Sequence, residues 1–127
     1  MKSNQVSVIL VHTAPFLAEY KSINNDIDTF QKEINCDFFD VKSFTVNGKK
    51  YSFYYDESGL YAKKTVPSLI NKNGDILLVN DFLICKEKQT EEGKVASSLT
   101  ADEAKTIMTS HFYNLNTTDV VIKAMMI

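Results

Sequence analysis

The stretch that decides the fold is VKSFTVNGKKYSFYY, residues 41–55. It places Asn47 and Gly48 between two runs that are rich in aromatic and β-branched residues. An Asn-Gly pair suits the positive φ angles of a two-residue type I′ turn, so the stretch predicts a β-hairpin. With that turn Phe44 faces Tyr51, and one face of the resulting sheet is strongly aromatic.

Other hydrophobic runs predict further strands on both sides of this hairpin. Residues 6–11 are rich in β-branched side chains and indicate a buried strand. Residues 76–79 and 82–85 fit either two short strands or one bulged strand. Between them and the hairpin, residues 60–69 carry Pro67 and no clean period, which indicates a loop with at most one helical turn. The charged residues 86–97 indicate an exposed loop.

A first amphipathic helix is predicted over residues 22–34. Its apolar side chains recur at intervals of four, three and four residues, which gives one apolar stripe. Ser22 stands at the start of this stripe, where a hydroxyl can cap the first turn.

A second helix is predicted after the sequence Thr-Ala-Asp-Glu at residues 100–103. This is a capping-box pattern, in which Thr100 caps the amide three positions on and Glu103 reaches back to the start. We expect the helix to bury His111 on its apolar side and to end near Asn114.

The order of these elements predicts an α+β domain. We expect a mixed or antiparallel sheet of four to five strands with two helices on one face. Residues 1–114 form this single domain, and residues 115–127 form an apolar C-terminal tail that either packs on its own core or forms an interface. The residues of such an oligomer interface, for example in a homodimer, would be Val121, Met125, Met126 and Ile127.

Charge and composition argue against direct binding of nucleic acid. The formal net charge is −2, and all 14 basic residues are lysines. Without arginine, the chain lacks the planar guanidinium group that recognises guanine and binds phosphate through two hydrogen bonds.

The apolar run at residues 6–11 is too short for a signal peptide core or a membrane span, so we expect a cytoplasmic protein with no membrane partner.

The ionisable residues form no recognisable catalytic pattern. Neither His12 nor His111 has a nucleophile at a diagnostic spacing, and the adjacent acids of the chain have local explanations in turns, loops and a helix start. Cys36 and Cys85 lie 49 residues apart without a CxxC motif, which disfavours zinc and indicates reduced core cysteines. We therefore expect no catalytic residues, no cofactor and no metal.

Several turns and caps of the chain occur in a characteristic order. They are YYDESGL at residues 54–60, then Pro67, NDFLIC at residues 80–85 and SLTADE at residues 98–103. This order resembles a small domain-of-unknown-function family carried by phages and conjugative elements of bacteria. The resemblance covers about residues 6–112, and the chain departs from the family by a single Pro67 in place of a double Pro and by a more aromatic hairpin.

The resemblance implies a mobile-element accessory protein, and proteins of this kind often bind and disable a host defence component. A CRISPR nuclease is one concrete target, because acidic side chains can meet its basic nucleic-acid channel. We expect Tyr54 to be exposed on the face opposite Tyr51 and to anchor the partner. The expected partner-binding residues are Tyr51, Tyr54, Asp56, Glu57, Glu91 and Glu92.

The alternative is a module that binds or sequesters a nucleotide between the copies of an oligomer. Lysine side chains would hold the phosphate, and a tyrosine would stack on the base. The absence of arginine counts against this alternative.

Overall fold

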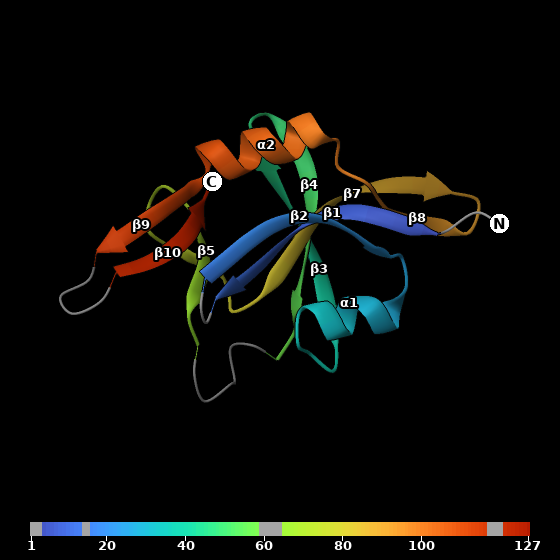
Figure 1. Ribbon diagram of the computed structural model, residues 1–127, viewed down its shortest axis with the longest axis horizontal. Helices are drawn as coiled ribbons and strands as arrows, with labels where there is room; N and C mark the ends of the chain where they lie inside the picture. The colour runs from blue at the N-terminus through green and yellow to red at the C-terminus, as the bar shows by residue number, and fades with distance from the viewer. Residues whose placement is uncertain (1–3, 14–15, 59–64, 117–120) are drawn as a thin grey trace.

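The computed structural model describes residues 4–13, 16–58, 65–116 and 121–127. These residues form two β-sheets and two α-helices, so the chain has the predicted α+β class (Figure 1). The sheets are larger than predicted, since the described residues form ten strands in place of four to five.

The larger sheet has six strands and is antiparallel throughout. Five of them lie in the order β2-β1-β7-β4-β3, and β8 pairs with the second half of β7. Their bounds are Gln5–Thr13 (β1), Phe16–Asn24 (β2), Phe39–Val46 (β3), Lys49–Asp56 (β4), Phe82–Thr90 (β7) and Gly93–Ser97 (β8).

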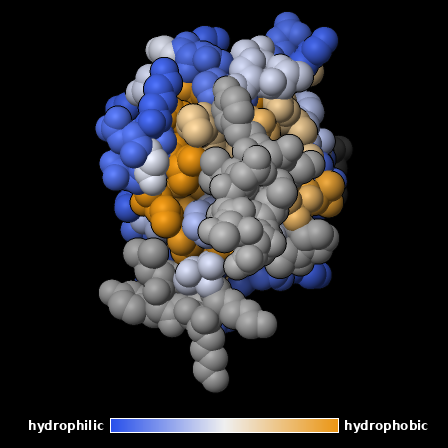
Figure 2. All heavy atoms as spheres, turned by 90° about the vertical axis from the view of Figure 1, so that its left-hand side faces the viewer, coloured by the Kyte–Doolittle hydropathy of each residue, from blue (hydrophilic) through white to orange (hydrophobic). Residues whose placement is uncertain are grey.

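The smaller sheet has four strands in the order β6-β5-β10-β9. It is mixed, because β10 runs parallel to β5 and antiparallel to β9. Figure 2 views the molecule from the side of this sheet and shows an area of apolar side chains at the surface, bordered by polar ones. The bounds of its strands are Pro67–Ile70 (β5), Ile76–Val79 (β6), Phe112–Asn116 (β9) and Val121–Met126 (β10).

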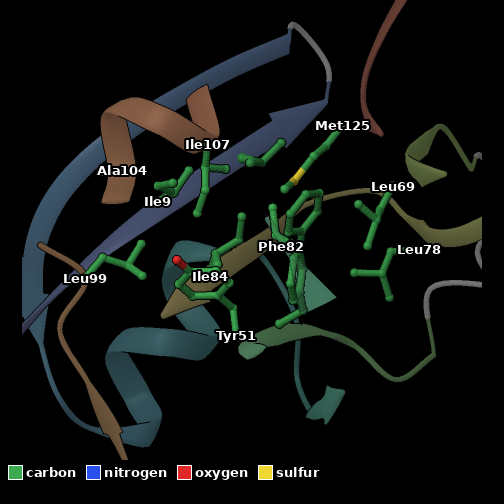
Figure 3. Packing of buried hydrophobic residues seen from close by; sticks show 13 residues of the cluster. Ile9, Tyr51, Leu69, Leu78, Phe82, Ile84, Leu99, Ala104, Ile107 and Met125 are labelled. Carbon is green, nitrogen blue, oxygen red and sulfur yellow. The ribbon is translucent and has the colours of Figure 1, made fainter. Parts of the chain in front are cut away.

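The central strands of the larger sheet are buried on both faces. In β1, Ile9 and Val11 belong to one apolar cluster, while Val8 and Leu10 belong to another on the opposite face. Helix α2 (Ala101–Ser110) and the smaller sheet cover the first cluster, which Figure 3 shows from close by. Helix α1 (Ile27–Glu33) covers the second.

The prediction that both helices lie on one face is therefore wrong. Phe30 of α1 packs in one cluster and Ile107 of α2 in the other. The physical reason is the uninterrupted apolar sequence of the central strands. When inward and outward positions are both apolar, each face of the sheet needs its own cover.

The hairpin at residues 41–55 is confirmed in type and register. β3 pairs with β4 so that Phe44 lies opposite Tyr51 and Val41 opposite Tyr54. The turn residues Asn47 and Gly48 have φ angles of 53° and 78°, as a type I′ turn requires.

The helix predicted over residues 22–34 begins later than expected. Residues 16–24 form strand β2, and Asp26 is the cap, since its Oδ1 accepts a hydrogen bond from the Thr29 amide at 2.7 Å. Ser22 instead donates to Gln5 across the β1–β2 pair. Ile27 is 64% exposed, so it does not belong to an apolar stripe. The predicted stripe combined residues of β2 with residues of α1.

The exposed loop predicted over residues 86–97 is also wrong, because β7 continues to Thr90 and forms a hairpin with β8. Residues 86–97 carry many polar side chains on both faces of this hairpin. They therefore lack the alternation of apolar and polar residues that marks a strand. The runs at 76–79 and 82–85 are two separate strands in different sheets. Asn80, with a φ of 61°, lies at the break between them.

Helix α2 begins with the predicted capping box, and both of its hydrogen bonds are present. It ends at Ser110, four residues earlier than predicted, because His111 forms the C-cap and Phe112 starts β9. The predicted loop at residues 60–69 lies partly outside the described residues, and its end, from Pro67, is strand β5.

The apolar C-terminal segment adds strand β10 to the smaller sheet. Met125 is 0% exposed and belongs to the main core cluster, so it packs on its own core and is not available to an interface. Met126 and Ile127 are partly buried, and the Ile127 amide donates to the Ile70 carbonyl at 3.0 Å. The side chain of Val121 lies outside the described residues.

We predict that Met125→Ala lowers the free energy of unfolding by about 2–5 kcal/mol, because it leaves a cavity in a closed core. Met126→Ala is the matched control and should cost clearly less. Urea unfolding of the two variants measures the difference. Equal losses would contradict the burial of Met125.

Candidate recognition site

Glu103 is the centre of a polar cluster that ties α2 to the larger sheet. Its carboxylate lies 2.8 Å from the Lys86 ammonium and 3.8 Å from that of Lys49, and it accepts a hydrogen bond from the Tyr51 hydroxyl at 3.3 Å. The side chain is only 10% exposed. Burial opposes its charge, but the hydrogen bonds from Lys86 and Thr100 outweigh burial and lower the pKa to about 2. The cluster thus stabilises the fold.

We predict that Glu103→Gln lowers the free energy of unfolding by about 1–2 kcal/mol at neutral pH, because glutamine can keep the cap but not the ion pair. A folded-state pKa lowered from 4.5 contributes stability above pH 4.5 that is lost as the pH falls toward 2. The wild type and the variant should therefore converge in urea unfolding at low pH. Glu92→Gln, an exposed acid, is the control. If the difference in the free energy of unfolding between wild type and Glu103→Gln were independent of pH, the lowered pKa of Glu103 would be contradicted.

A second polar cluster forms around Asp81, between β6 and β7. One carboxylate oxygen lies 2.9 Å from Nδ1 of His12, and the other accepts a hydrogen bond from the Thr13 amide at 3.0 Å. The Asn35 amide also donates to Asp81, at 3.2 Å. These contacts join the end of β1 and the end of α1 to the start of β7. His12 is thus held by a single carboxylate.

The two thiols are poor nucleophiles. Burial, together with the carboxylates of Asp56 and Asp37, raises the pKa of Cys36 to about 11. Burial raises the pKa of Cys85 to about 12. In the part of the chain that the structure describes, no group of three or more His, Cys, Asp or Glu side chains could hold a metal ion.

The two tyrosines expected to bind a partner lie in the core. Tyr51 is 4% exposed and Tyr54 is 8% exposed. They do occupy opposite faces of the sheet, as predicted, but the expected exposure of Tyr54 is wrong. Its ring packs edge-on against Phe30, with centroids 5.1 Å apart, and also against Phe39, at 5.5 Å. Burial raises the pKa of the Tyr54 hydroxyl.

The four acids expected to bind a partner fall into two separate places. Asp56 is the last residue of β4 and Glu57 follows it, at the end of β4 that lies beside Phe82 of β7. Glu91 and Glu92 form the tip of the β7–β8 hairpin, nine residues beyond Phe82. At about 3.3 Å per residue this separation is roughly 30 Å, so the two pairs cannot belong to one small patch.

The structure brings an exposed aromatic ring beside the first acidic pair. Phe38 is 68% exposed, and its carbonyl accepts a hydrogen bond from the Glu57 amide at 3.2 Å. This bond continues the β3–β4 ladder one pair beyond Phe39 and Asp56. We define the Phe38 patch as Asp37, Phe38, Asp40, Asp56 and Glu57.

The Phe38 patch is strongly negative. Within the described part of the chain, none of its four carboxylates forms an ion pair with a lysine or histidine. Asp56 accepts hydrogen bonds from Ser58, and Asp40 accepts one from the Tyr55 hydroxyl. The patch therefore presents four negative charges around one apolar ring.

Sequence reasoning missed Phe38, although a signal was present. Phe38 and Phe39 are adjacent, and successive side chains of an extended chain point to opposite sides. Phe39 packs against the cluster under α1, so its neighbour faces elsewhere.

The chain matches no protein-family model, no curated protein and no solved structure. Among the described residues, the two helices contain seven and ten residues, and neither is long and apolar enough to cross a membrane.

Proposed function

We propose that this chain is a non-catalytic accessory protein of a phage or mobile element, which binds and inhibits a defence protein in the bacterial cytoplasm. A CRISPR nuclease is one such target. The observation that carries the proposal is the Phe38 patch. The mobile-element context rests on the sequence resemblance around the turns and caps.

Phe38 has the properties of an interface anchor. It is the most exposed of the large apolar side chains in the described part of the chain. Covering an aromatic ring removes a large apolar area from water, and a few such residues supply most of the binding energy of an interface. Phe38 lies directly before β3, and the hydrogen bond from the Glu57 amide to its carbonyl restrains the backbone, so little conformational freedom is lost on binding.

The acids around Phe38 define the chemistry of the partner. Four carboxylates that form no ion pair with any described residue favour a surface of opposite charge and speed its association. A protein that binds nucleic acid has such a basic surface. An acidic patch with an apolar centre can therefore occupy a basic channel and exclude the nucleic acid.

The two thiols support binding without turnover. Burial raises the pKa of Cys36 and of Cys85, which disfavours the thiolate that nucleophilic cysteine chemistry needs. Glu103 is engaged by Lys86 and Thr100, in contacts that hold α2 on the larger sheet.

We predict that a purified CRISPR nuclease binds the wild-type chain and that Phe38→Ala weakens the complex at least about tenfold, as expected for an anchor. Asp56→Asn with Glu57→Gln should slow association and reduce its salt dependence. Biolayer interferometry at low and high salt measures both effects, and a cleavage assay reports inhibition.

Two matched controls test whether the effects are specific to the Phe38 patch. Ile76→Ala removes another exposed apolar side chain, from β6, and Glu91→Gln with Glu92→Gln removes the other acidic pair. Both should leave binding unchanged. The proposal fails if Phe38→Ala behaves like Ile76→Ala, or if no nuclease of a panel that represents the main CRISPR types is bound.

A further inference from the structure

A cleft opens where strands β4 and β7 separate. Their ladder ends at the pair Ser52 and Cys85. Beyond it, β4 pairs only with β3, while β7 pairs with β8, and the two hairpins diverge (Figure 1). The cleft has a volume of about 300 Å³ and receives side chains from both hairpins. It is lined by Ser43, Lys50, Ser52, Lys86, Glu87, Gln89 and Lys94.

The lining is basic. It contains three lysines and one acid, Glu87. Lys94 lies 3.8 Å from Glu87, a loose contact, and Lys86 is held by Glu103 at 2.8 Å. Lys50 has no ion pair within the described part of the chain. The cleft therefore attracts an anion, and Lys50 is the cation that is free to contact it.

Hydroxyl groups complete the lining. Ser52 is 2% exposed, and among the described residues its side chain forms no hydrogen bond. Ser52 lines the cleft, so its hydroxyl can donate a hydrogen bond to a ligand there. Ser43, the cross-strand neighbour of Ser52, adds a second donor. Lysine ammonium groups with neutral hydroxyl donors are the chemistry that holds phosphate oxygens.

We infer that this cleft binds the phosphate group of a small phosphorylated molecule. Its volume is at the lower end of ligand pockets, which fits a molecule the size of a mononucleotide better than a polymer. The lining named above includes no aromatic ring, so recognition rests on the phosphate and not on stacking with a base. The site is distinct from the Phe38 patch, because Lys50 and Asp56 lie toward opposite ends of β4.

The test is a titration of the full chain followed by amide chemical shifts, with inorganic phosphate, adenosine monophosphate and adenosine as probes. The two phosphate-bearing probes should produce saturable shifts around Ser43, Lys50 and Ser52, and adenosine should not. Lys50→Gln should weaken phosphate binding at least about tenfold. Lys72→Gln, an exposed lysine in the β5–β6 connection, is the control and should have no effect.

A second pair of variants tests the role of the Ser52 hydroxyl. Ser52→Ala should weaken phosphate binding and leave thermal unfolding unchanged or improved. Ser68→Ala removes a hydroxyl of β5 that is buried and has no hydrogen-bond partner among the described residues, and it should leave phosphate binding unchanged. The inference is overturned if phosphate causes no saturable shifts at the cleft, if adenosine alone causes the same shifts, or if Lys50→Gln equals Lys72→Gln.

Discussion

The rest of the structure depends on the burial of both faces of one strand segment, Phe82–Cys85 in β7. All four residues are 0% exposed. The segment pairs with β1 on one edge and with β4 on the other, and its side chains enter both core clusters alternately. Full burial of such side chains contributes about 1.5–3 kcal/mol each, so this short segment links the two clusters energetically. Helix α2 and the smaller sheet pack on one face of this segment, and helix α1 packs on the other.

The two polar clusters lock these covering layers to the central sheet. Glu103 connects α2 to β4 and β7, and Asp81 connects the end of α1 and the end of β1 to the start of β7. The two features that we propose to contact a partner or a ligand lie toward the two ends of β4. The Phe38 patch lies at one end and the basic cleft toward the other.

Local signals in the sequence predicted local structure well. The Asn47-Gly48 turn fixed the hairpin register, and Thr100 with Glu103 marked the start of α2. Sequence reasoning failed where contacts between distant parts of the chain determine the secondary structure or the site. Ile23 fits a helical stripe, yet it lies in β2 and still joins the cluster under α1. The contact between His12 and Asp81 joins residues 69 positions apart, so no local spacing could reveal it. The cleft arises from the divergence of two hairpins, one of which has too many polar side chains to be recognised as strands.

Native-state amide hydrogen exchange tests the central role of β7 most directly. The amides of Phe82–Cys85 and their partners in β1 and β4 should exchange only through global unfolding, with the highest free energy of opening in the chain. The β7–β8 tip around Glu91 should exchange much faster. The account would be contradicted if the amides of Phe82–Cys85 exchanged as readily as those of this tip, or if the smaller sheet alone held the slowest amides.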